Sequence, residues 1–186
     1  MTIDFMKAIP IPLLDNTILY STGADGYPAF SISLNASINK SVSTFVTRVT
    51  ADFAVVATIR PETDVGGFLF AVVDPSSTII EFGLKVSAAI GDEATAATNV
   101  SQIFLYYTDR RDEASQPIAQ FLVPQLTHIW TKFGLKVKGD AVTLYLNCDV
   151  HSSVKTGGER AELTFEEGSM LYFAQAGPKF GGKFEV

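Results

Sequence analysis

Large apolar side chains recur at every second position along many short segments of this chain, and this pattern restricts its fold more than any other feature. Along residues 80–86 the alternating apolar residues are Ile80, Phe82, Leu84 and Val86. Glu81 and Lys85 lie between them, which is typical of an extended strand with one buried face. The same period recurs in residues 30–34, 53–59, 103–107 and 135–137. The chain is therefore expected to fold mainly into half-buried strands.

Further strands are predicted where β-branched and aromatic residues concentrate, at residues 67–73, 118–123 and 170–175. Segments rich in Gly, Pro, Asp and Ser separate the strands, at residues 61–67, 74–77, 91–99, 109–117 and 157–158. One short helix is expected after Asp4, its N-cap, and it must end before Pro10. Many short strands without helical segments between them predict an all-β fold, an antiparallel two-sheet jelly-roll sandwich with little helix.

The clearest hairpin signal lies at residues 131–146. Alternation up to Val137 is followed by Lys138, Gly139 and Asp140, and it resumes at Val142. Gly139 can adopt the positive φ that a tight turn requires. We expect one core, to which the following residues contribute: Phe53, Phe82, Trp130, Leu135, Val137 and Leu144.

Length and composition indicate a single domain spanning residues 1–186. A chain of 186 residues with 47% hydrophobic residues can bury a sizeable core without disulfides or metals. The formal net charge of -6 argues against a general nucleic-acid-binding protein. No apolar stretch approaches the roughly 20 residues that span a bilayer, and residues 1–14 do not have the pattern of a signal peptide. We therefore expect no membrane insertion.

The residues that could carry catalysis do not form a convincing set. A sandwich enzyme that cleaves glycans needs two positioned carboxylates, but Glu166 and Glu167 are adjacent and precede Gly168 in an expected solvated turn. No G-x-S-x-G motif accompanies the two histidines, and His128 is expected to have a packing or surface role. We therefore predict no enzymatic activity and no catalytic residue.

Two motifs match cofactor sites only in part. Cys148 and His151 form C-x-x-H, but a structural zinc site needs four ligands and no second cluster supplies the others. The glycines of residues 177–182 are not expected to join a strand to a helix, as a phosphate-binding loop requires, so a turn is predicted there. The sequence therefore predicts no metal site and no cofactor.

Three lysines share one face of the strand expected at residues 131–137 and its end. Lys132, Lys136 and Lys138 are separated by even numbers of residues, so their side chains should leave the same side of the sheet. The simpler interpretation is a solvated outer face. The alternative is a weak contact site for a sulfated glycan.

Three N-x-[ST] triplets lie in polar stretches and make Asn35, Asn39 and Asn99 candidate N-glycosylation sites. Such triplets also occur by chance, so they add modestly to the expectation of a secreted protein. The single cysteine, Cys148, cannot form a disulfide within this chain, and cysteine content therefore does not identify the redox compartment.

Several short motifs, taken in order, resemble a thrombospondin N-terminal-like domain, a member of the laminin-G-like (concanavalin A-like) sandwiches. The central motifs are Asp52-Phe53-Ala54, Arg60-Pro61, Gly66-Gly67-Phe68-Leu69-Phe70-Ala71, Leu105-Tyr106-Tyr107-Thr108, Trp130 and Val142-Thr143-Leu144-Tyr145-Leu146-Asn147-Cys148. The resemblance is greatest to the N-terminal noncollagenous domain of the multiplexin collagens XV and XVIII. It then extends to the two ends, at Ile11-Pro12-Leu13, Gly26-Tyr27-Pro28-Ala29-Phe30, Ala174-Gln175-Ala176-Gly177 and Lys179-Phe180-Gly181-Gly182.

This resemblance implies a secreted, non-enzymatic module of the extracellular matrix, located at basement-membrane zones and active in structure or cell adhesion. The implied partners are matrix proteins or cell-surface molecules, and heparan-sulfate or other glycan binding is the alternative. Trimerisation is implied only together with collagenous segments, which this sequence does not include.

The chain departs from the family's pattern at three places. The family's cysteine at Cys148 normally pairs with a second cysteine beyond the last strand, whereas this sequence ends at Val186, within that expected strand. We therefore expect a free thiol. Residues 91–99 form a longer loop than the family's, and residues 35–44 are polar and contain sequons, so a binding surface there would be peculiar to this protein.

Overall fold

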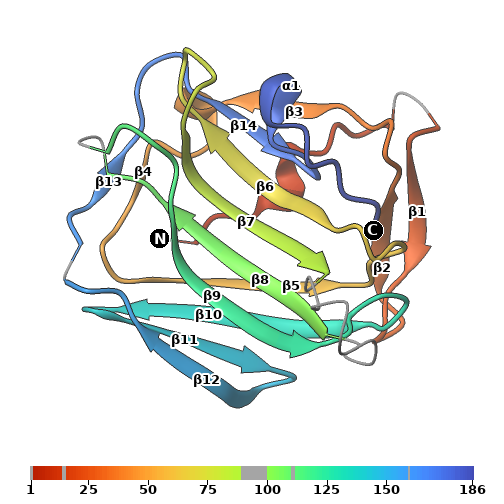
Figure 1. Cartoon of the computed structure of the whole chain (residues 1–186). Coiled ribbons are helices and arrows are strands. Elements are labelled where there is room, and N and C mark those ends of the chain that lie inside the picture. Colours follow the sequence, from red (N-terminus) through yellow and green to blue (C-terminus); the bar gives the residue numbers. More distant parts are fainter. Residues whose placement is uncertain (1, 14–15, 89–99, 110–111, 159) are drawn as a thin grey trace.

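Two antiparallel β-sheets stack face to face in the computed structural model, which describes residues 2–13, 16–88, 100–109, 112–158 and 160–186 (Figure 1). The larger sheet has six strands in the order β3 (Ile38–Ser41), β14 (Met170–Phe173), β6 (Gly67–Val73), β7 (Ile80–Ala88), β8 (Val100–Tyr107) and β9 (Pro117–Pro124). The smaller sheet has four, in the order β12 (Asp149–Lys155), β11 (Ala141–Leu146), β10 (Thr131–Lys138) and β5 (Phe53–Ile59). The predicted all-β antiparallel sandwich is confirmed.

Two short strand pairs complete the sheet structure. One is the hairpin of β1 (Ile18–Thr22) and β2 (Pro28–Ile32), and the other pairs β4 (Arg48–Val49) with β13 (Leu163–Thr164). The helices are equally short: the 3-10 turns η1 (Phe5–Ala8) and η2 (Val42–Thr44), and the single-turn helix α1 (Gly177–Phe180). The Asp4 carboxylate accepts a hydrogen bond from the Met6 amide, so Asp4 is the N-cap predicted for the first helix. No helix in the described ranges is long and apolar enough to cross a membrane.

The alternating residues of the sequence form the core between the two sheets. Phe82, Leu84 and Val86 of β7 belong to this core. Ile80, predicted on the same face, is instead buried on the outer face of the larger sheet, because the register of β7 with β6 shifts between Ile80 and Phe82. From the opposite sheet, the ring of Phe53 packs edge-on against Phe82 at 5.5 Å between ring centroids and stacks on Tyr107 at 5.9 Å. Aromatic pairs at this spacing add to the hydrophobic stabilisation from area burial. The period of two therefore predicts correctly which face is inside for β5, β8 and β10, and for β7 from Phe82 onward.

The hairpin predicted at residues 131–146 is confirmed as the pair β10–β11. Lys138 lies opposite Ala141, so Gly139 and Asp140 alone form the turn, and Gly139 has a φ of +57°. The Gly139 amide donates to the Asp52 carboxylate at 2.9 Å, which ties this turn to the start of β5.

The larger sheet is covered on its outer face as well. Phe68, Ala71 and Val73 of β6 pack there with Ile80 and Ala176, and Phe180 of α1 and Tyr172 of β14 pack against this second cluster. Figure 1 shows α1 over this end of the sheet. The turn predicted for residues 177–182 is therefore wrong in part, because Gly177–Phe180 form one helical turn. Phe180 of this turn packs against the second cluster.

Trp130 is not part of the core, contrary to the sequence prediction. Its side chain is half-buried at the start of β10, outside both buried clusters, and the Arg60 guanidinium lies 5.6 Å from its ring centroid. Trp130 precedes the alternating residues of β10, so the pattern that places Leu135 inside does not extend to it.

The last residues of the chain lie against the larger sheet because Gly67 of β6 has no side chain to keep them away. A Cβ added at Gly67 would collide with the backbone carbonyl of Lys183 and would lie 2.7 Å from that of Gly182. Phe184, which follows, is 1% exposed, and Val186 exchanges two backbone hydrogen bonds with Ile32 of β2. This segment thereby connects the β1–β2 hairpin to the sandwich.

Candidate functional site

The outer face of the four-stranded sheet carries the three lysines singled out from the sequence. Along β10, Thr131, Phe133, Leu135 and Val137 are buried, whereas Lys132, Lys136 and Lys138 are exposed. Their orientation is therefore as predicted, and the alternation of the strand is its cause. We call this outer surface of β5, β10 and β11 the lysine face.

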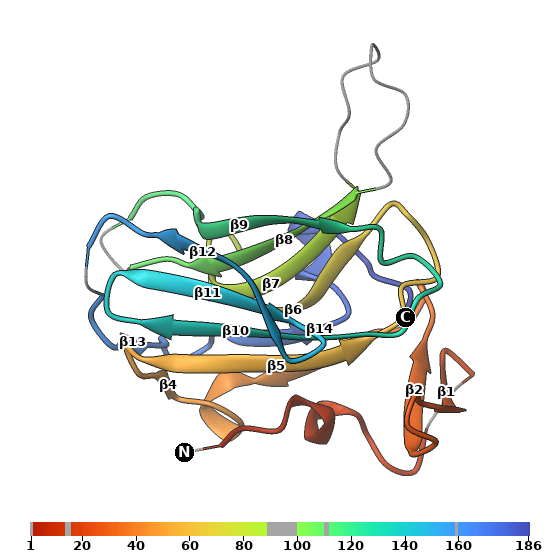
Figure 2. The same cartoon turned by 90° about the horizontal axis from the view of Figure 1, so that it is seen from below.

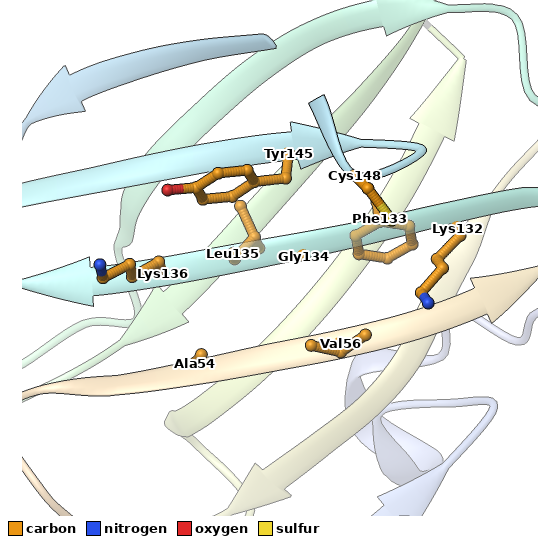
Figure 3. A pocket seen from close by; sticks show the side chains of 9 residues that line it. All are labelled: Ala54, Val56, Lys132, Phe133, Gly134, Leu135, Lys136, Tyr145 and Cys148. Carbon is orange, nitrogen blue, oxygen red and sulfur yellow. The ribbon is translucent and has the colours of Figure 1, made fainter. Parts of the chain in front are cut away.

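A shallow groove of about 270 Å³ crosses the lysine face at Gly134 (Figure 3). Gly134 has no side chain, and its cross-strand neighbours are Tyr145 on β11 and Val56 on β5. Their side chains form the two long walls, and Ala54 and Cys148 also line the groove. The groove exists because a glycine stands between two larger side chains on the same face.

Lys132 and Lys136 stand at the two ends of this groove (Figure 3). Four residues along a strand span about 13 Å, so the two ammonium groups can hold acidic groups that are spaced along one extended ligand. Within the described part of the chain neither lysine forms an ion pair. Both charges are therefore available to a ligand.

Lys138 has a different environment, which the sequence pattern does not reveal. It lies at the turn beside Asp140, and Asp52 receives the hydrogen bond from Gly139 next to it. Lys155 on β12 lies across Ala141 from Lys138 and is 3.8 Å from the Asp140 carboxylate. These carboxylates offset the positive charge at this end, so the basic part of the lysine face is centred on Lys132 and Lys136.

The groove combines an aromatic wall with two cations. Tyr145 is half-buried, and one side of its ring faces the groove while its hydroxyl points toward the Lys136 end (Figure 3). A tyrosine offers an apolar ring and a polar tip with little loss of side-chain entropy. The arrangement suits a ligand with an apolar surface flanked by acidic groups. Sequence analysis missed Tyr145 and Val56, although a two-residue turn at Gly139 would have placed Tyr145 opposite Gly134.

Cys148 lies in a turn and does not continue the buried face that Val142 and Leu144 form on β11. Asn147 and Cys148 form the two-residue turn between β11 and β12, with φ values of +50° and +77°. The Asn147 side chain accepts from the Lys132 amide at 3.3 Å, and its backbone amide donates to the Lys132 carbonyl at 2.7 Å. Cys148 is therefore an exposed free thiol beside the groove.

Of the candidate glycosylation sites, the two in the described residues lie outside the four-stranded sheet that carries the lysine face. Asn35 and Asn39 are exposed, Asn39 on the edge strand β3. Asn99 lies outside the described residues, as does the rest of the loop at 91–99. Glycosylation of these residues stays a prediction.

The residues considered for catalysis and metal binding do not come together. Glu166 and Glu167 are exposed before the turn at Gly168, and the His128 ring, 69% exposed, lies 3.4 Å from the Glu62 carboxylate. His151 makes a hydrogen bond of 2.9 Å with the Leu122 carbonyl on β9. Among the described residues, no group of three or more His, Cys, Asp or Glu side chains could hold a metal ion.

The fold defines the chain as a laminin-G-like jelly roll, as the sequence predicted. Domains LG4-5 of the mouse laminin alpha1 chain match with a TM-score of 0.50 and 12% identity, over 92% of this chain and 40% of that chain. A SAP-like pentraxin from Limulus polyphemus matches with a TM-score of 0.51 and 14% identity, over 76% and 60%. Domain 4 of the arabinanase AbnA from Geobacillus stearothermophilus, solved with arabinotriose, matches with a TM-score of 0.52 and 17% identity, over 94% and 75%. At these identities the matches establish the architecture alone.

The resemblance to the multiplexin collagens is also confirmed. The chain is similar to the human collagen alpha-1(XVIII) chain, with 30% identity over 134 residues, which are 72% of this chain. It spans 7% of the length of that collagen. No family model matches the sequence.

Proposed function

We propose that this chain is a non-enzymatic module of the extracellular matrix, which serves structure or cell adhesion by contacting other macromolecules through its sheet surface. The similarity to collagen XVIII and the laminin-G-like fold support this role. The proposal includes a secreted protein at basement-membrane zones, one domain over residues 1–186, and trimerisation only when collagenous segments are joined to it.

The observation that carries the proposal is the exposed lysine face with its groove. Tyr145, Gly134 and Val56 form one row across three strands, and Lys132 and Lys136 flank it. Rigid strands hold these side chains in place, and no Asp or Glu side chain lines the groove. The surface is therefore suited to binding.

A binding assay on immobilised, solubilised basement-membrane extract tests the proposal. The parent chain should bind saturably, and Gly134→Val, which fills the groove without a backbone collision, should weaken binding by about tenfold, or 1.4 kcal/mol. Lys7→Ala/Lys40→Ala should bind like the parent, because both lysines are exposed away from β10. Equal binding by all three proteins would exclude the lysine face as the contact surface. Release of reducing ends from matrix glycans would contradict the non-enzymatic role.

A second candidate, binding of heparan sulfate or another sulfated glycan, is favoured by the same two cations. Their field is local, because exposed charges act over a Debye length of about 8 Å at physiological salt and the net charge of the chain is -6. Weak binding that disappears near physiological ionic strength is therefore expected.

Retention on a heparin column distinguishes the two candidates. The parent and Lys132→Ala/Lys136→Ala are compared at low salt and at about 0.15 M sodium chloride, with Lys7→Ala/Lys40→Ala as the charge-matched control. If the parent and the control both lose retention at the higher salt, the adhesive role is preferred. If the parent and the control stay bound at the higher salt and Lys132→Ala/Lys136→Ala does not, glycan binding would be the function.

A further inference from the structure

Of the four edges of the two stacked sheets, that of β5 alone has neither a charge, a proline, a register shift nor a short length to discourage pairing with a further strand. Phe53–Ile59 (FAVVATI) has seven residues, no charge and no proline, and its register with β10 is uninterrupted. β5 is the last strand of its sheet, and no backbone hydrogen bond joins it to a further strand in the described ranges. An uncharged, regular edge strand is a template for the addition of another strand.

The three other edges show the protection that natural sheets use. β9 has a proline at each end, and β3 is four residues long and contains Lys40. β12 contains Asp149 and Lys155, pairs through a register shift, and contacts β9 through the hydrogen bond from His151. Charges, prolines, bulges and short length all discourage pairing. The absence of such protection at β5 therefore indicates that this edge has a binding role.

A cleft of about 380 Å³ runs beside this edge. It lies between β5, the first residues of the chain and the β1–β2 hairpin, which Figure 2 shows beside one another. Most of its lining is apolar, including Phe5, Phe30 and Trp130. The volume lies within the range of about 300–1,000 Å³ that is usual for ligand sites.

The shape and charge of the cleft decide between occupants. A second folded copy that paired with β5 would meet residues 3–6 and the β1–β2 hairpin, whereas a single extended segment fits between them. Among the described residues lining the cleft the charged ones are Asp4 and Asp25, each of which accepts one backbone hydrogen bond from its own turn. A partner segment with a Lys or Arg side chain complements these carboxylates.

We propose that the free edge of β5 binds an extended, mainly apolar peptide segment of a partner protein as an additional strand, with a Lys or Arg of that segment directed at Asp4 and Asp25. Main-chain hydrogen bonds to β5 supply affinity, and the cleft selects alternate side chains of the segment. This site shares Val56 with the groove of the lysine face, but the inference does not depend on the function proposed for that face.

Selection from a displayed library of random peptides, about ten residues long and so at the upper end of strand lengths, tests the proposal on the full chain. Enriched peptides should alternate apolar residues and contain Lys or Arg. Bound peptide should protect β5 amides from hydrogen exchange. Asp25→Asn, which keeps an acceptor for the Tyr27 amide, should weaken binding several-fold. Replacing the basic residue of the peptide with Glu should weaken it further.

Methylation of the peptide backbone supplies the decisive control. In an added strand, the N–H groups of every second residue donate hydrogen bonds to β5. N-methylation of these residues should therefore reduce affinity at least tenfold, and N-methylation of the alternate residues should leave the affinity unchanged. Equal effects of both sets would refute strand addition.

Protein variants localise the site. Val56→Lys should abolish binding, and Val150→Lys should not, because both valines are 66% exposed but on opposite edges of the sheet. Val56 also lines the groove of the lysine face, so Lys132→Ala/Lys136→Ala must retain the peptide. The proposal would be overturned if Lys132→Ala/Lys136→Ala lost peptide binding or if the library yielded no enriched peptide. It would also be overturned if the parent formed dimers that Val56→Lys dissociates.

Discussion

Adjacent residues of β10 should differ widely in what they contribute to stability, because the strand separates core from solvent residue by residue. Leu135 is 0% exposed and Lys136 is exposed. Leu135→Ala removes buried methyl groups and leaves a cavity, so it should lower the free energy of unfolding by about 2–5 kcal/mol. Lys136→Ala should change it by less than about 0.5 kcal/mol. Urea unfolding of both variants checks this, and similar midpoints would contradict the assignment of the two faces.

The thiol of Cys148 should be reactive in the folded protein. It is exposed at the turn between β11 and β12, and no other cysteine exists in the chain to pair with it. Iodoacetamide without denaturant or reductant should therefore add one label per chain, as measured by mass. Labelling that requires denaturant would show that the thiol is buried, and labelling that requires a reductant would show an intermolecular disulfide.

Among the structural elements, β6 depends most on a glycine. Gly67→Ala would bring a methyl group into the backbone of residues 182–183, so the final segment with Phe184 must shift. Overpacking of this kind costs about 1–3 kcal/mol. The matched change Gly134→Ala on β10 has its nearest non-local neighbours at 3.8 Å and should be neutral or slightly stabilising. Thermal unfolding of the two variants compares them, and an unchanged Gly67→Ala would mean that the final segment is not held there.

The elements that the sequence pattern predicts are those with one apolar face. β5, β8 and β10 alternate clearly, and their buried sides are correct, as is that of β7 except at Ile80. β12 and β3 were missed because most of their side chains are polar and neither strand has an alternating apolar face. Such strands are held by backbone pairing with a neighbour, and that pairing leaves no period in the sequence.

The candidate groove was predictable in part for the same reason. That Lys132 and Lys136 lie on the same face follows from their spacing along a single strand. The position of Tyr145 follows from the local turn at Gly139, whereas Val56 reaches Gly134 only through the pairing of β5 with β10, which joins distant parts of the chain. Local patterns predict faces, and long-range register is what they leave open.

On the scale of the whole molecule, three aromatic rings connect the two sheets. Phe53 of the four-stranded sheet packs against Phe82 and Tyr107 of the six-stranded sheet, and the Tyr107 hydroxyl donates to the Ala161 carbonyl at 2.6 Å. Arg160 lies over the Tyr107 ring at 5.8 Å. A charge at Tyr107 would thus disturb contacts on which the stacking of both sheets depends.

Alkaline unfolding should therefore report on the whole sandwich. The pKa of Tyr107 is raised to about 12. Burial is the main cause, a backbone hydrogen bond and Arg160 oppose the shift, and the carboxylates of Asp109 and Glu162 add to it. Burial also raises the pKa of Tyr106. The unfolded chain releases the phenolic proton near pH 10 and the folded chain retains it to about pH 12, so the stabilisation is complete below pH 10 and lost between these values. The loss from Tyr107 should be about 2 kcal/mol.

Tyr107→Phe tests this assignment, because phenylalanine keeps the ring contacts and cannot ionise. The variant should be less stable at neutral pH by about 1 kcal/mol, through the lost hydrogen bond to Ala161. Its free energy of unfolding, measured in urea from pH 8 to pH 12, should fall less steeply than that of the parent above pH 10. Parallel curves would show that Tyr107 is not the group whose ionisation separates the two sheets.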